Sequence, residues 1–156
     1  MQLKIEKIIK QSFAVIGKEG STKDGVDFIK HLWADANMNF SEISPLIKYG
    51  DDNAPVGIWG VMSDFSRSFL PLEDNFSKGL YLAGAECDIN VVPPNGWHKW
   101  IIPSYEYICI ENDGENIFAE GIAYLNENKY ELVGAVHELT IIKIGKNYLY
   151  FPIKRI

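Results

Sequence analysis

Short apolar runs, several of them alternating with polar residues, recur along the chain and are typical of β-strands. Turn residues separate them, most clearly at Val92-Pro93-Pro94-Asn95-Gly96 and Gly145-Lys146-Asn147. The predicted strands are Leu3 to Gly17, Val56 to Ser63, Leu80 to Ile89, Trp97 to Ile102, Tyr105 to Glu111, His137 to Ile144 and Tyr148 to Ile153. We expect a strand pair broken at Pro103 and a hairpin at the end of the chain.

In two other segments the apolar residues recur at helical spacing, which predicts amphipathic helices. The first can be capped by Thr22 or Asp24 and should end between Asn37 and Asn39. Its apolar face is Val26, Ile29, Leu32, Trp33 and Ala36. The second begins after Asn112 or Asp113, and its predicted buried face is Ile117, Phe118, Gly121, Ile122, Tyr124 and Leu125.

The two halves of the chain resemble each other. Ile8 to Ile16 aligns with Ile101 to Ile108 when one gap is allowed, and each stretch leads to a Gly-bearing turn and an amphipathic helix. The strand-to-helix distances in the two halves agree to within one residue. We therefore predict an α+β fold of duplicated βαββ-type halves, with an antiparallel sheet, two main helices and a central ligand cleft.

Composition narrows the class of protein. A chain of 156 residues suits a single domain, here 1–156. A net charge of −6 and no basic stripe argue against direct nucleic-acid binding and weakly favour cationic ligands. Cys87 and Cys109 suit buried thiols in a reducing compartment. With no signal peptide and no apolar run long enough to span a bilayer, we expect a cytoplasmic protein without a membrane partner.

Glu138 is the candidate with the clearest chemistry. On a strand it shares a face with Val136, Thr140 and Ile142, so its carboxylate lies on a mostly apolar surface. Such a carboxylate needs protonation, a hydrogen bond or a bound cation. The alternative is an edge strand with Glu138 in water.

Aromatic residues make up 13% of the chain, which is more than a core of this size requires. Tyr148 and Tyr150 share one face of the last strand and could flank Glu138 as cation–π partners. Ordinary strand propensity explains the same two tyrosines. Four further rings can be interpreted either way: Trp59, Tyr81, Trp97 and Trp100.

The usual catalytic and cofactor motifs are absent from the sequence. His31, His98 and His137 fall in different elements without metal-ligand spacing, and no phosphate loop or nucleophile elbow is present. We assign no metal, no cofactor and no catalytic residue. Glu86 could form a carboxylate pair with Glu138 only if the sheet brings the two together.

A succession of short motifs resembles the gyrase-inhibitor-like small-molecule-binding family, which includes effector domains of AraC-type and MerR-type multidrug-responsive activators. The motifs are Leu80 to Glu86, Ile102 to Tyr105, Tyr130 to Gly134 followed by His137-Glu138-Leu139, and Tyr150 to Lys154. Together they span essentially the whole chain. The resemblance implies two βαββ-like halves around a cleft, and implies that Glu138 meets cationic lipophilic ligands. It also implies that Tyr148 is a pocket tyrosine and that Trp59 and Tyr81 lie on the strands walling the cleft.

Three functions follow from this resemblance and from the residues. We expect a stand-alone, non-enzymatic protein that senses or sequesters a hydrophobic, cationic small molecule, with Glu138, Trp59, Tyr81, Trp97, Tyr105, Tyr148 and Tyr150 as ligand-binding residues. The first alternative is a hydrolase of strained electrophiles that uses Glu138 as general base, for which Trp97, Trp100 and Tyr105 are further pocket candidates. The second is a module that inhibits a protein partner.

Overall fold

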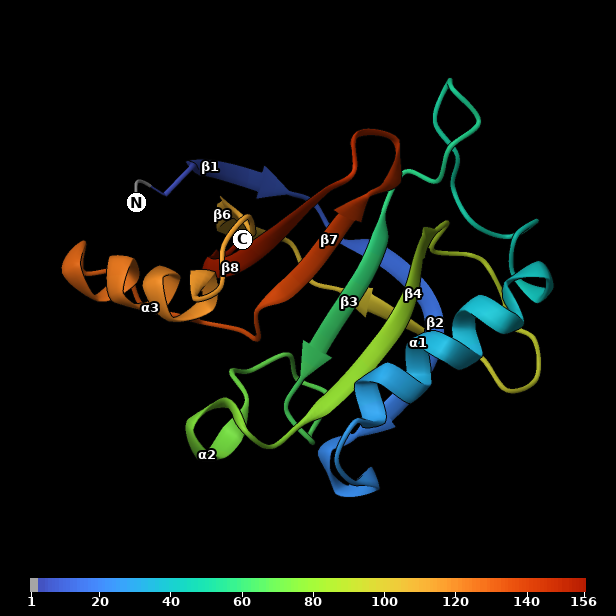
Figure 1. Cartoon of the computed structure of the whole chain (residues 1–156), viewed down its shortest axis with the longest axis horizontal. Helices are drawn as coiled ribbons and strands as arrows, with labels where there is room; N and C mark the ends of the chain where they lie inside the picture. Colours follow the sequence, from blue (N-terminus) through green and yellow to red (C-terminus); the bar gives the residue numbers. More distant parts are fainter. Residues whose placement is uncertain (1–2) are drawn as a thin grey trace.

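The computed structural model describes residues 3–156, apart from the side chains of residues 75 and 76 (Figure 1). Within that part, one sheet contains all named strands: β1 Ile5–Lys10, β2 Phe13–Ser21, β3 Ile58–Ser63, β4 Leu80–Cys87, β5 His98–Ile102, β6 Tyr105–Glu111, β7 His137–Ile141 and β8 Lys146–Arg155. The helices are α1 Phe28–Met38, the single turn α2 Glu73–Phe76 and α3 Ile117–Glu127. Short 3₁₀ turns cover Thr22–Asp24, Phe40–Glu42 and Ile142–Ile144.

The strand order shows the predicted duplication. It runs β1-β6-β8-β7-β3-β4-β2-β5, and every pairing is antiparallel. The triplet β6-β8-β7 repeats β2-β4-β3 about an axis between β7 and β3, and each triplet carries one helix between its first two strands in the sequence. The α+β fold of two βαββ halves is therefore confirmed.

Two strand predictions are wrong, and both errors have one cause. The run Leu3 to Gly17 is two strands, because the chain leaves β1 at Gln11 and continues in the other half as β2. Likewise β5 and β6 do not pair with each other: β5 pairs with β2, and β6 pairs with β1 and β8. The two links between these strands, β1 to β2 and β5 to β6, contact each other: the Ser12 N–H donates to Ser104 Oγ at 2.7 Å. Each half thus lends its first strand to the other half.

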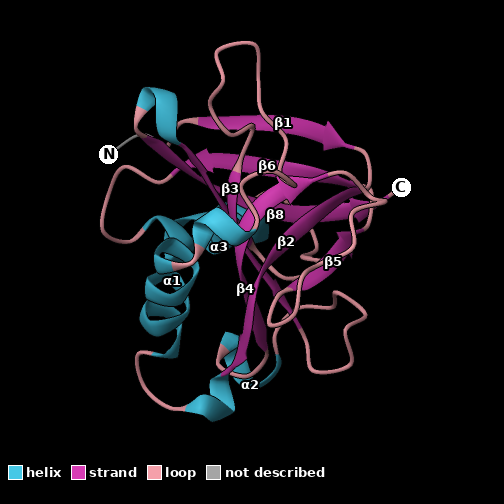
Figure 2. Ribbon diagram, turned by 90° about the vertical axis from the view of Figure 1, so that its right-hand side faces the viewer, coloured by secondary structure: helices cyan, strands magenta, loops and turns pink. Residues whose placement is uncertain are grey.

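The helices cover only one face of the sheet (Figure 2). Under α1 lies a cluster built on Ile16, Ala36 and Ala85, and under α3 lies one built on Ile110, Leu125 and Phe151. The first helix is shorter than predicted, because Gly25 at φ 106° and Asp27 at φ 64° interrupt its start. Val26 is consequently 92% exposed and not part of the buried face.

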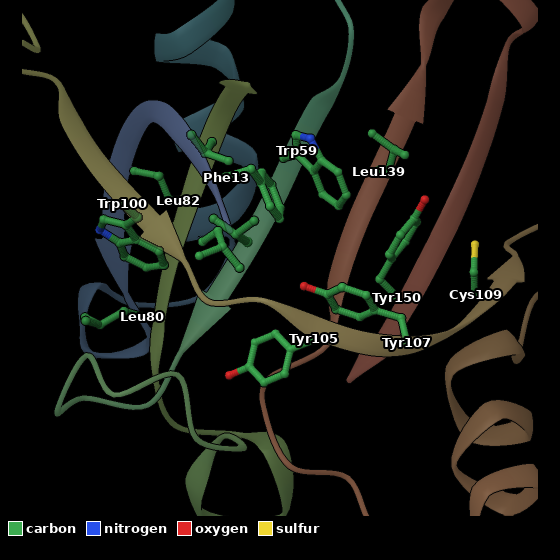
Figure 3. Close-up of a cluster of buried hydrophobic side chains, with 13 residues drawn as sticks. Phe13, Trp59, Leu80, Leu82, Trp100, Tyr105, Tyr107, Cys109, Leu139 and Tyr150 are labelled. Carbon is green, nitrogen blue, oxygen red and sulfur yellow. The ribbon is translucent and has the colours of Figure 1, made fainter. Parts of the chain in front are cut away.

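The opposite face carries the largest aromatic cluster of the described residues. Rings from several strands pack together there and exclude solvent (Figure 3). The aromatic cluster comprises Phe13, Trp59, Trp100, Tyr105, Tyr107 and Tyr150, and Phe65 and Phe69 of the connection between β3 and β4 pack against it. Its rings meet mostly in tilted or edge-on geometries, such as Trp59 and Tyr150 at 5.2 Å between centroids.

A buried ion pair ties the two halves together beside this cluster. Lys10 at the end of β1 places its Nζ 3.4 Å from Glu86 Oε1 on β4, and Trp59 Nε1–H donates to the same carboxylate oxygen at 3.1 Å. The ammonium also lies 4.4 Å from the centroid of the Phe13 ring. Because the Glu86 side chain is only 8% exposed, its charge depends on Lys10 for compensation.

Replacing Lys10 with Met keeps most of the aliphatic stem and removes the charge. We expect the free energy of unfolding to fall by about 1–3 kcal/mol, below the cost of breaking a fully buried pair because Lys10 is partly exposed. Urea denaturation of both proteins measures the change. Lys7→Met is the matched control on the same strand, since its ion pair with Glu106 is solvent-exposed and should contribute little. Equal effects of the two substitutions would contradict the assignment.

Candidate functional site

The candidate site is a cleft between the two helices, above the seam where the two halves meet. Figure 1 shows α1 and α3 on either side of the central strands β7 and β3. The hollow measures about 200 Å³ and is mostly apolar. Its lining residues are Ile29 from α1, Phe118 from α3, and Met62, Tyr81, Val136, His137, Glu138 and Leu149 from the sheet and its margin.

Strands β7 and β3 pair over only a short stretch, and the cleft lies where their pairing ends. Regular pairing ends with Gly60 opposite Glu138. Beyond it, the Met62 N–H donates to Nδ1 of the His137 ring at 3.2 Å, so a side chain takes the place of a backbone acceptor. Burial lowers the pKa of His137 to about 3. The imidazole is therefore neutral near pH 7 and does not act there as a general acid.

Glu138 occupies the base of the cleft, half-buried, on the helix-covered face. Among the described residues, its carboxylate has no ion-pair partner and no side-chain hydrogen bond, and burial alone raises its pKa above the ordinary value of 4.5. The carboxylate thus lies on an apolar surface without a compensating cation from the chain. This arrangement favours a proton or an external cation at that position.

Tyr81 reaches toward Glu138 across a strand that has no side chain at that point. Gly60 lies between them, and a Cβ there would stand 2.1 Å from Tyr81 Oη. The hydroxyl accepts a hydrogen bond from Trp33 Nε1–H on α1 at 2.9 Å, so its own proton stays available to the cleft. Burial, with a further contribution from the Glu138 charge, raises the pKa of Tyr81, and the phenol remains protonated.

Of the predicted site residues, the structure brings only Glu138 and Tyr81 together. Leu149 is the residue opposite Glu138 on β8, so Tyr148 and Tyr150 point to the other face of the sheet. The expectation that these two tyrosines flank the carboxylate is wrong. The physical reason is the register: one step along the strand moves a side chain to the opposite face.

The remaining predicted rings also lie away from the cleft. Trp59 and Tyr105 belong to the aromatic cluster, where the Tyr105 hydroxyl donates to the carbonyl of Phe69 at 3.2 Å. Trp97 packs in the cluster under α1 and donates to Glu42 Oε1 at 2.8 Å. Trp100, also in the aromatic cluster, donates to Glu19 at 2.7 Å.

Glu86, considered as a carboxylate partner for Glu138, lies on the opposite face and pairs with Lys10 instead. Sequence reasoning missed several cleft residues. The sequence pattern places Ile29 and Phe118 only on the inner faces of helices and gives Met62 no ligand role. It also does not predict that Trp33 on α1 holds Tyr81 in place. The predicted fold contains the information needed to find these residues, because two helices on one face of a duplicated sheet must present side chains to the groove between them.

No three His, Cys, Asp or Glu side chains within residues 3–156 are grouped so that they could hold a metal ion. None of the helices described is both long and apolar enough to cross a membrane.

No family model matches the sequence, and no curated protein does either. The fold, however, matches known structures over nearly its full length. SAV2435 bound to tetraphenylphosphonium matches with a TM-score of 0.66 at 16% identity, over 99% of this chain and 94% of that one. The EcmrR C-terminal domain matches with 0.67 at 12% identity, over 100% of both chains. An integron cassette protein from Vibrio cholerae matches with 0.55 at 16% identity, over 97% and 95%.

At these identities the matches establish the fold alone. That fold is the one that the resemblance in the sequence predicts. The location of the cleft and of Glu138 within it comes from the geometry of this chain.

The unpaired carboxylate makes a prediction about stability. Because the pKa of Glu138 is raised in the folded state, the folded protein binds more protons than the unfolded one between pH 4.5 and that raised value, and stability falls as pH rises through this interval. Glu138→Gln should therefore raise the melting temperature at pH 7, and the difference should shrink toward pH 4. Thermal melts of both proteins across this range measure it. A variant that is less stable at pH 7 would show that the carboxylate has a partner in the fold.

Proposed function

We propose that this protein binds a lipophilic organic cation in the cleft between α1 and α3, with ionised Glu138 as the counter-charge. The observation that carries the proposal is the half-buried Glu138 carboxylate, which has no compensating cation among the described residues and lies in a hollow lined by aliphatic and aromatic side chains. A bound cation supplies the missing charge, and an apolar ligand body replaces water on the walls.

The aromatic walls add to this preference. Tyr81 and Phe118 line the hollow, and Trp33 and Phe28 stack edge-on against Tyr81 at 6.5 Å between centroids. Each ring that faces a cation contributes about 0.5–2 kcal/mol. In this proposal the ligand is held without chemical turnover, and the function is sensing or sequestering it. The solved structure of SAV2435 with tetraphenylphosphonium supports the same class of ligand for this fold.

Calorimetry with benzyltrimethylammonium tests the proposal, since this cation carries the same charge at every pH. We expect saturable one-to-one binding that weakens at least tenfold in Glu138→Gln, a loss of about 1.4 kcal/mol or more. Binding to the wild type should also weaken on acidification, beginning above pH 4.5, because the raised pKa of Glu138 makes protonation compete with the ligand. The variant should lack this pH dependence.

Glu131→Gln serves as the charge-matched control, because Glu131 is exposed and outside the cleft. It removes the same charge and should bind as the wild type does. If both variants bind equally well, Glu138 is not the anchor and the proposal fails.

A second candidate function is hydrolysis of a strained electrophile. The raised pKa of Glu138 favours it, since a carboxylate of higher basicity accepts a proton more readily from an attacking water. The step would form a bond between the water oxygen and a ring carbon, break one bond of the strained ring and pass a water proton to Glu138. The departing ring atom keeps the bonding electron pair and then takes up that proton, so the product is the substrate plus one water. Mass spectrometry of a cyclopropane-bearing or alkylating compound distinguishes the two functions: a hydrated product that disappears in Glu138→Gln indicates turnover, and unchanged ligand indicates binding.

A further inference from the structure

A second hollow adjoins the Glu138 cleft along its α3 side. It measures about 140 Å³ and is lined by apolar residues only: Met62, Leu72, Phe118, Ala135 and Val136. Three of these residues, Met62, Phe118 and Val136, also line the Glu138 hollow. The two spaces therefore share a wall made of those three side chains.

The three residues of this wall differ in burial and in the element that carries them. Val136 is 6% exposed and belongs to the cluster packed under α3, and Met62 is part of strand β3, so both form the floor. Phe118 comes from the first turn of α3 and is 39% exposed, with its ring 6.0 Å from that of Phe151. Because Phe118 lies on a helix, truncating its side chain removes part of the wall and leaves the strands of the sheet unchanged.

The volumes limit what fits on the Glu138 side. An apolar cavity of about 150 Å³ holds one benzene molecule. The hollow of about 200 Å³ next to Glu138 accordingly fits one aromatic ring with a small cationic group. A tetraarylphosphonium presents four rings around its charge, and Phe118 belongs to the wall that the first hollow shares with the adjoining 140 Å³.

We propose that Phe118 is a specificity-determining residue, which divides the cleft and restricts its ligands to single-ring organic cations. This inference rests on the proposed function and deepens it, because it names the size class of the cation. The charge comes from Glu138 and the size limit from Phe118. The second hollow has no charged lining residue, so joining it to the first adds apolar contact without a new anchor.

Calorimetry with two permanent cations, benzyltrimethylammonium and tetraphenylphosphonium, tests the division. The wild type should bind benzyltrimethylammonium at least tenfold more tightly than tetraphenylphosphonium. In Phe118→Ala the two hollows join, and the affinity for tetraphenylphosphonium should rise at least tenfold. The affinity for benzyltrimethylammonium should stay the same or fall a few-fold, because one ring contact is lost.

Four further variants serve as controls for this experiment. Phe118→Leu retains most of the bulk and should keep the wild-type preference. Phe40→Ala removes a partly buried ring packed in the cluster under α1 and should not alter the ratio of affinities. Phe118→Val is the second truncation, used if thermal melts show that Phe118→Ala does not fold. Adding Glu138→Gln to the truncated variant should abolish the gained tetraphenylphosphonium binding.

The outcomes separate the two levels of the argument. If the wild type binds both cations equally well through Glu138, or if truncation leaves the ratio unchanged, the role of Phe118 is overturned while cation binding stands. If neither cation binds, or if Glu138→Gln binds benzyltrimethylammonium as the wild type does, the proposed function fails and the inference fails with it.

Discussion

The short pairing of β3 with β7 is the constraint on which the candidate site depends. At the centre of the sheet, β3 and β7 pair through three matched residue pairs, from Ile58 opposite Thr140 to Gly60 opposite Glu138. Past that point His137 accepts the Met62 N–H and the strands part. Since each half carries its helix on the same face, this parting leaves a hollow between α1 and α3 and places Glu138 at its base. A longer seam would have filled that space with cross-strand neighbours.

The buried carboxylates show why Glu138 is different. Glu86 has Lys10 and the Trp59 indole, and Glu19 has a two-pronged contact with Arg67 and the Trp100 indole. Burial alone would raise the pKa of Glu19, but these bonds outweigh it and the pKa is lowered. For Glu138 burial acts without opposition. Glu86 and Glu19 thus have partners within the chain, whereas Glu138 has neither an ion pair nor a side-chain hydrogen bond among the described residues, and the proposed cation would supply that partner.

The aromatic residues divide into two groups with different roles. The largest aromatic cluster packs on the face of the sheet opposite the helices, where the rings build a core and where several indole and hydroxyl groups find partners within the chain. Fewer face the cleft, and these are the ones beside the unpaired acid. The excess of rings in the composition is therefore mainly a property of the core, and the ligand hypothesis depends on Tyr81 and Phe118 rather than on the number of aromatics.

Local patterns were enough to predict both main helices, the terminal hairpin, the duplication and the apolar surroundings of Glu138, because these depend on spacing along one segment. The partners of each strand were not predictable in this way. Nothing near Gln11 or Pro103 in the sequence announces that the chain crosses to the other half, and the register that turns Tyr148 and Tyr150 away from Glu138 is set by pairing with distant strands. The sequence by itself thus determined which residue carries the unusual charge. Only the tertiary structure decided which side chains surround it, because neighbours across a sheet and between two helices are fixed by long-range packing.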